Sequence, residues 1–99
     1  MPDLNKLAAR VLGMCKYRNW SLSWLARGVY LHLETSELIE AIRGKGDSTP
    51  LKEAADILLV LMSITENASI PFNRVIETLE EKLVYLEQAP PYPNEEIIG

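Results

Sequence analysis

The chain has 99 residues with 14 acidic and 10 Lys or Arg side chains, which gives a formal charge of -4, and 47% of its residues are hydrophobic. A chain of this length and composition forms one globular domain with a modest core, so subunit association is expected to supply part of its stability. The negative charge argues against a domain that binds a nucleic acid polymer, because such a domain needs a basic excess or a basic face.

The cysteine content and the apolar runs bear on the compartment. The one cysteine, Cys15, cannot form an internal disulfide, and one His with one Cys is too few for a zinc site built from those ligands. The polar start, residues 1–6, is not followed by an apolar run of the signal-peptide type. The longest apolar stretch, residues 57–62, is far short of the ~20 residues that cross a bilayer. We therefore expect a cytoplasmic protein with no membrane partner, in which Cys15 is an inert buried thiol.

Apolar residues at helical spacing predict a first helix over about residues 3–16, with Asp3 as its N-cap. A polar and aromatic segment then interrupts the period. Ser21 or Ser23 can cap a second helix, which continues to about Arg43.

The pair Thr49 and Pro50 predicts the start of a third helix over residues 50–67, because proline at the first helical position lacks only an N–H that has no partner there. A second apolar period predicts a fourth helix over about residues 72–88. The proline-rich residues 89–99 cannot continue a helix, so we expect an extended C-terminal tail.

Short connections and the absence of a strand pattern predict an all-α fold, a four-helix bundle-like domain over residues 1–88. The third helix is apolar on almost all sides and is expected to be central. The second helix has two apolar sides, of which the one with Trp24 and Leu31 is expected to face the core. The other side is formed by Leu25, Val29 and Leu33. Two apolar sides on one helix favour an interface between subunits of a homo-oligomer.

Four carboxylates form two pairs, Glu34 with Glu37 and Glu53 with Asp56, each spaced to project from one helix face. Glutamates on helices are usually solvated, as we expect for Glu40. Helical phase, however, places Glu53 and Asp56 on the same stripe of their helix as apolar residues further along it, so we expect these two acids to face the interior. Burying four carboxylates without a counter-charge is costly, and a bound cation is the simplest resolution. Oxygen ligands select hard ions such as Mg²⁺, with Mn²⁺ as a possible substitute.

The segments that carry these pairs, ETSELIEAI from Glu34 and EAADILLVL from Glu53, resemble the signature of MazG-like all-α nucleoside triphosphate pyrophosphohydrolases. The triplet RNW before the second helix resembles the dCTP-pyrophosphatase branch. The resemblance covers about residues 20–83. It implies Mg²⁺-dependent hydrolysis of a (deoxy)nucleoside triphosphate to the monophosphate and pyrophosphate, in house-cleaning or nucleotide-pool control, by a homodimer or homotetramer.

The resemblance also implies roles for individual residues. The implied metal ligands are Glu34, Glu37, Glu53 and Asp56. Glu37 is our candidate for orienting the attacking water, and Lys82 matches the family's basic residue on the last helix. Trp20 can stack on the nucleobase or serve packing, and Lys52 is a candidate phosphate contact. Leu86 stands one turn after Lys82, where many family members have Asn.

Two alternative functions remain open. One is a phosphoribosyl-ATP pyrophosphohydrolase-like enzyme, which performs similar chemistry on another substrate. The other is a non-catalytic helical interaction or adaptor module that retains an acidic cleft, as the short chain and the altered C-terminal motif suggest. Release of pyrophosphate from nucleotides separates the enzymes from the adaptor.

Overall fold

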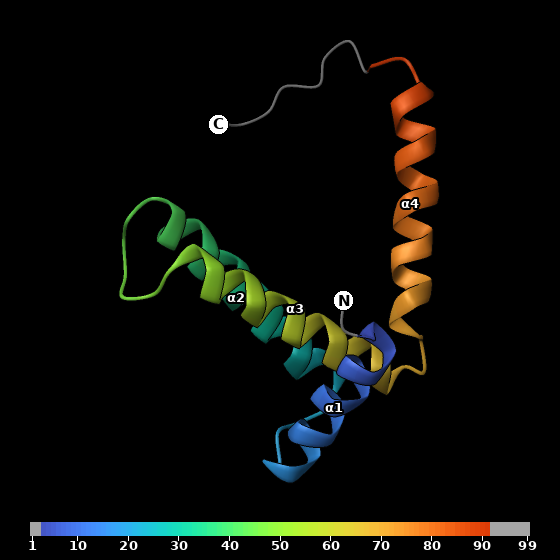
Figure 1. The fold of residues 1–99 in the computed structure, drawn as a ribbon. Coiled ribbons are helices and arrows are strands. Elements are labelled where there is room, and N and C mark those ends of the chain that lie inside the picture. Colours follow the sequence, from blue (N-terminus) through green and yellow to red (C-terminus); the bar gives the residue numbers. More distant parts are fainter. Residues whose placement is uncertain (1–2, 92–99) are drawn as a thin grey trace.

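The computed structural model describes residues 3–91, which form four helices and no strand (Figure 1). The helices are α1 (Leu4–Tyr17), α2 (Trp24–Ile42), α3 (Pro50–Asn67) and α4 (Phe72–Gln88). The expected all-α class and the four helices are confirmed. Of the expected tail, residues 92–99 lie outside the described part of the chain.

Three of the four helices begin at a side-chain cap. Asp3 accepts hydrogen bonds from two backbone N–H groups of the first turn of α1. Ser23, and not the alternative serine, caps α2 by accepting from the N–H of Ala26. Thr49 caps α3 by accepting from the N–H of Lys52. These caps satisfy N–H groups that have no partner inside the helix. For this reason the capping residues allow the first residue of each of these helices to be predicted closely from the sequence.

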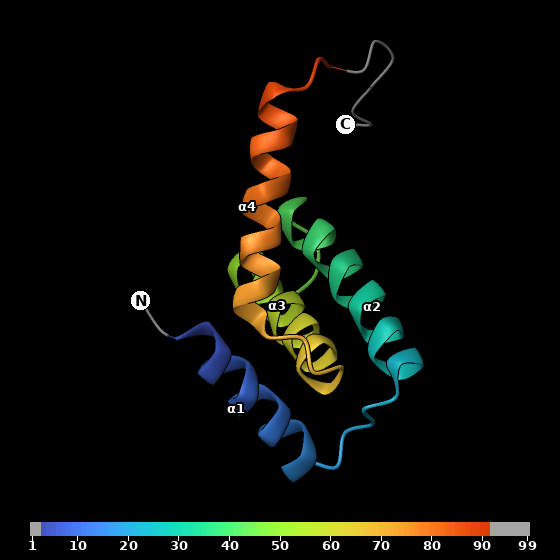
Figure 2. The ribbon, with the colours of Figure 1, turned by 90° about the vertical axis from the view of Figure 1, so that its right-hand side faces the viewer.

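The helix α3 is central, as its apolar sequence predicted. It contacts each of the other three helices, with α2 beside it as a hairpin and α1 packed across it (Figure 1). The chain turns by 110° between α3 and α4, so α4 stands away from the hairpin in the view of Figure 1, whereas the two overlap in the view of Figure 2. Within residues 3–91 there is no contact between α2 and α4, and a single chain therefore does not close into a four-helix bundle.

The core lies where α1, α3 and α4 meet. Ala8, Met62 and Phe72 form its buried cluster. Cys15 is fully buried, as expected for an inert thiol on the apolar face of α1. Few apolar side chains are buried, and many of those on α2 and α4 are exposed.

The expectation that Trp24 belongs to the core is wrong, because its side chain is 81% exposed. Trp24 is the first residue of α2, and α2 packs against α3 alone. Leu31 on the same side of α2 is half-buried. Trp24 lines a cavity with Ile64 and Asn67 near the end of α3, and because no helix other than α3 contacts α2 within residues 3–91, most of the Trp24 side chain stays exposed.

No single helix within residues 3–91 is long and apolar enough to span a membrane, and α3 and α4 reach that length and composition only when taken together across their bend.

Candidate functional site

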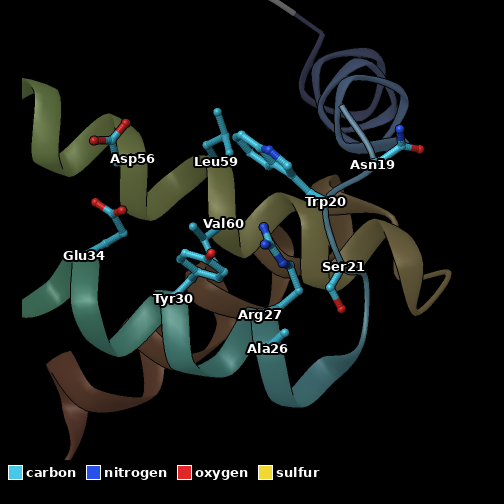
Figure 3. A pocket seen from close by; sticks show the side chains of 10 residues that line it. All are labelled: Asn19, Trp20, Ser21, Ala26, Arg27, Tyr30, Glu34, Asp56, Leu59 and Val60. Carbon is cyan, nitrogen blue, oxygen red and sulfur yellow. The ribbon is translucent and has the colours of Figure 1, made fainter. Parts of the chain in front are cut away.

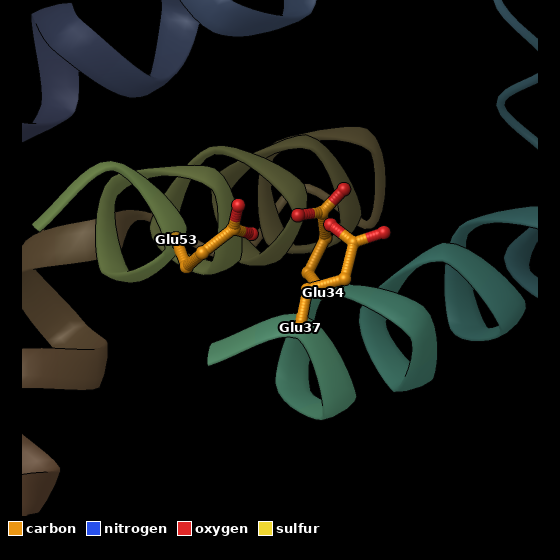
Figure 4. A group of neighbouring side chains, drawn as sticks. All are labelled: Glu34, Glu37 and Glu53. Carbon is orange, nitrogen blue, oxygen red and sulfur yellow. The ribbon is translucent and has the colours of Figure 1, made fainter. Parts of the chain in front are cut away.

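Three glutamates from α2 and α3 converge, and we call them the acidic cluster: Glu34, Glu37 and Glu53. Glu34 and Glu37 come from successive turns of α2, and Glu53 comes from the start of α3 and points toward them (Figure 4). One carboxylate oxygen of each lies within 4.8 Å of the others. The pairing of the helices therefore brings together carboxylates that are up to 19 positions apart in the sequence, from Glu34 to Glu53.

Two of these carboxylates are buried without a partner. Glu53 is only 5% exposed. One oxygen of Glu53 and one of Glu34 are buried and accept no hydrogen bond from any residue in the described part of the chain. A buried carboxylate oxygen without a donor is costly, and either a cation or a proton shared between the two carboxyl groups would lower that cost.

The protonation of the cluster reflects the same crowding. Burial, followed by the charges of Glu37, Asp56 and Glu53, raises the pKa of Glu34 from 4.5 to about 7. Burial and the charge of Glu53 also raise the pKa of Glu37. Like charges held together favour uptake of a proton, or of a metal cation in its place.

The donor set fits a hard divalent cation. All three groups are carboxylates, and no Lys or Arg of residues 3–91 forms an ion pair with them. Oxygen ligands at this spacing suit Mg²⁺ or Mn²⁺, which retain several waters when two or three carboxylates hold them. The acidic cluster can therefore hold such an ion with its unpartnered oxygens.

Asp56 lies close to the cluster but differs from it in burial. It projects from α3 opposite Glu34, at one end of a cavity (Figure 3). Its carboxylate is exposed, which corrects the expectation that both acids of the third helix are interior. The phase of the helix directs Asp56 toward α2 as expected, but the cavity leaves it accessible. Glu40 is exposed, as expected.

The cavity next to the acidic cluster has a volume of about 580 Å³ and is bounded by α2, α3 and the loop after α1. Glu34 and Asp56 lie at one end and Trp20 at the other, with Tyr30 between them (Figure 3). A volume of this size is within the range of small-molecule sites, and an acidic end facing an aromatic end suits a ligand that is flat at one end and carries a cation at the other.

A second cavity of about 350 Å³ lies on the other side of the cluster, below the loop between α2 and α3. Glu37 and Glu53 line it together with Lys45 and Lys52. Lys52 is thus placed beside the acidic cluster, where the sequence proposed a phosphate contact.

Lys82 is not brought to the site within one chain. It is exposed on α4 and lines neither of the two cavities beside the acidic cluster. It lies in a shallow depression of α4 with Arg74 and Leu79.

Sequence reasoning missed Arg27, which lines the aromatic end of the larger cavity. This side chain is 4% exposed, and its Nε is buried without a hydrogen-bond partner among the described residues. Its guanidinium carbon lies 4.7 Å from the ring centre of Tyr30 and 5.6 Å from that of Trp20. The signal was available, because Arg27 precedes Glu34 by two helical turns and shares its face of α2.

Comparison with known proteins agrees with this arrangement. Residues 25–86, more than half of the chain, match the family model described as the MazG nucleotide pyrophosphohydrolase domain. The matched segment contains all of the acidic cluster, Asp56 and Arg27, and it begins after Trp20. Neither the curated proteins nor the solved structures contain a significant match.

Proposed function

The chain belongs to the family of MazG nucleotide pyrophosphohydrolase domains, and from that premise we propose that it hydrolyses (deoxy)nucleoside triphosphates in a Mg²⁺-dependent reaction. The products are the nucleoside monophosphate and pyrophosphate, formed when water cleaves the bond between the α and β phosphates. The role we propose for this activity is house-cleaning or control of the nucleotide pool in the cytoplasm.

The observation that carries the proposal is the pair of buried, unpartnered oxygens of Glu34 and Glu53. Glu34 lines the cavity that has an aromatic far end, and Glu53 lines the second cavity on the other side of the acidic cluster. A bound divalent cation would satisfy both oxygens at once, and a polyphosphate is the substrate that a carboxylate-held Mg²⁺ typically meets. At the aromatic end, Trp20 and Tyr30 are 39% and 47% exposed, and a nucleobase can stack on the parts of their rings that the Arg27 guanidinium leaves uncovered.

We assign the metal to Glu34, Glu37, Glu53 and Asp56. When bound, Mg²⁺ neutralises the phosphate charge and orients the substrate. Glu37, half-buried and lining the second cavity, is our choice for orienting the attacking water. The reaction then needs no covalent enzyme intermediate.

Three further residues complete the proposed substrate site. Trp20 stacks on the base, and Lys52 contacts phosphate from the second cavity. Because α4 and α2 are not in contact within the described part of one chain, Lys82 can meet the substrate only if a partner subunit supplies it. We therefore propose that the enzyme works as a homodimer or homotetramer.

The test is release of pyrophosphate from a panel of nucleoside triphosphates in the presence of Mg²⁺. We expect Glu53→Gln and Asp56→Asn to lower kcat/KM at least about 100-fold, because each removes a charged ligand of the metal. Glu40→Gln is the matched control, since Glu40 is exposed and is not in the acidic cluster, and it should retain activity within about twofold. Equal losses at all three positions would show that the cluster is not the metal site.

The same assay, with phosphoribosyl-ATP added to the panel, decides between the alternatives. A phosphoribosyl-ATP pyrophosphohydrolase-like enzyme would release pyrophosphate only from that substrate. An adaptor module would release none, and its support here is the extent of exposed apolar surface on α2 and α4. The unpartnered carboxylates favour the enzyme, because an adaptor has no need to keep them buried.

A further inference from the structure

Arg27 is the one buried cationic side chain among the described residues. Its Nε–H has no acceptor there, although an unpaired buried donor on a charged group is among the most costly features a fold can retain. The guanidinium points into the larger cavity, between the rings of Trp20 and Tyr30 (Figure 3). Stacking on aromatic rings stabilises the charge but leaves the in-plane N–H groups without acceptors.

The acidic cluster does not supply the missing acceptor. Arg27 forms no ion pair with any carboxylate within residues 3–91. Tyr30 lies between its guanidinium and the carboxylate of Glu34 (Figure 3). The cation and the acids thus occupy opposite ends of one cavity, and a ligand that spans the cavity meets them with different parts of its structure.

A nucleotide whose phosphates lie at the acidic end places its base at the Arg27 end. A guanidinium has only donors, arranged as a planar fork, so it pairs with acceptors that lie in one plane. A base that stacks on Trp20 next to the Arg27 guanidinium presents its edge, and not its face, to that guanidinium. The acceptors that the guanidinium can meet are therefore ring nitrogens and carbonyl oxygens of the base.

We propose that Arg27, held between Trp20 and Tyr30, is a specificity-determining residue that selects nucleotides whose base carries a keto group in place of an exocyclic amino group. This inference rests on the proposed function and names a substrate class for the same site. A keto base offers acceptors, as guanine does with O6 and N7, and Arg paired with those two atoms is the commonest specific contact to a base in the major groove of DNA. An amino group at the same position is a donor that faces another donor.

The test uses pairs of nucleoside monophosphates that differ at this position, so that it does not depend on hydrolysis. Inosine monophosphate and adenosine monophosphate carry a keto and an amino group at the same purine carbon, and uridine and cytidine monophosphates do so among pyrimidines. Titration calorimetry with Mg²⁺ should show that the keto member of each pair binds about tenfold or more tightly than the amino member, given the discrimination that one good Arg contact provides.

The variant Arg27→Met keeps the length of the side chain and removes its donors. We expect its keto-to-amino ratio to fall to within about twofold of unity, while Arg10→Met, an exposed arginine on α1, keeps the wild-type ratio. Arg27→Lys, which keeps the charge but not the planar fork, should show an intermediate ratio. If Arg27→Met does not fold, the ratio measured for Arg27→Lys is used to test the inference.

Three outcomes would overturn the inference. They are a wild-type protein that binds all four monophosphates equally, a protein that binds none of them, and an Arg27→Met variant that weakens all four equally, as loss of a phosphate contact would. The proposed function is judged separately by pyrophosphate release. No release from any triphosphate together with an Arg27-dependent keto preference would overturn the proposed function alone, and release without that preference would overturn only this inference.

Discussion

At the scale of single residues, the site holds polar groups whose partners the chain itself does not provide. Glu34 and Glu53 lack donors, and Arg27 lacks an acceptor, within the described residues. Unpaired buried groups reduce the stability of the folded protein, and Glu34 and Arg27 lie at opposite ends of one cavity, where a ligand that spans it would contact both. The metal-free, ligand-free protein is expected to be less stable than its size would allow.

The raised pKa of Glu34 gives this expectation a pH dependence. The pKa rises from 4.5 to about 7 on folding, so the native state binds more protons than the unfolded state between those values. The free energy of unfolding of the metal-free protein should therefore be greatest below about pH 4.5, as far as this group is concerned, and should fall as the pH rises through 7. Thermal melts in chelator from pH 5 to 8 measure it.

Mg²⁺ should reverse this trend, because it binds the ionised carboxylates and competes with their protons. Its stabilising effect should be small at pH 5 and large at pH 8, where ~100 times its Kd adds about 2.7 kcal/mol to the free energy of unfolding. The Glu34→Gln variant is the control, since it cannot titrate at this position and its chelator melts should lose most of the slope. A chelator melting temperature that rises steadily from pH 5 to 8 would contradict the assignment.

At the scale of elements, the start of α3 fixes the position of Glu53. Thr49 caps that helix, and the preceding loop contains Gly44 and Gly46, whose φ values of +75° and +81° are left-handed and suit glycine. Glu53 follows the cap by four residues, so it sits in the first turn, where fraying would displace it. Local sequence signals thus set the placement of a ligand on which the site depends.

This dependence predicts the effect of Thr49→Ala. The variant loses the hydrogen bond from the N–H of Lys52, which costs about 1 kcal/mol and lowers the melting temperature by roughly 4–8 °C. It should also weaken Mg²⁺ binding measured by calorimetry, because the first turn that carries Glu53 frays. The neighbouring Ser48→Ala serves as the control, since Ser48 makes no side-chain hydrogen bond in residues 3–91. Similar losses in both variants would show that the cap does not determine the effect.

At the scale of the whole molecule, apolar surface remains uncovered. The second apolar side of α2 is exposed, including Val29 at 61%, and α4 presents exposed leucines along the length that extends from the hairpin. Contiguous apolar surface of this kind marks interaction sites in most proteins. A small core and two uncovered helix faces support the proposed association of subunits.

We expect light scattering at micromolar concentration to give a mass of two or four chains. Val29→Glu places a charge in the proposed interface and should shift the mass toward one chain. Ala9→Glu adds the same charge on the exposed face of α1 and should leave the assembly intact. A wild-type mass of one chain would contradict the proposed association and, with it, the role of Lys82.

The sequence by itself determined the helices and the spacing of their acids. Caps and apolar periods act within one or two turns, so they predicted α3 at residues 50–67 as observed and the cap at Thr49. The spacing of Glu34 with Glu37 and of Glu53 with Asp56 was the basis for expecting a metal site, because residues three apart share a face of any helix. Local chemistry sufficed wherever the cause of the feature lay in neighbouring residues.

Only the tertiary structure decided which of these faces is covered. The angle at which α2 and α3 pack buries Glu53 and leaves Asp56 at the cavity wall. The single neighbour of α2 leaves Trp24 exposed, and the loop after α1 brings Trp20 over Arg27. The burial of a side chain depends on helices and loops that are distant in the sequence. Helical periodicity shows which residues share a face, but it does not show how far along the helix a neighbouring helix covers that face.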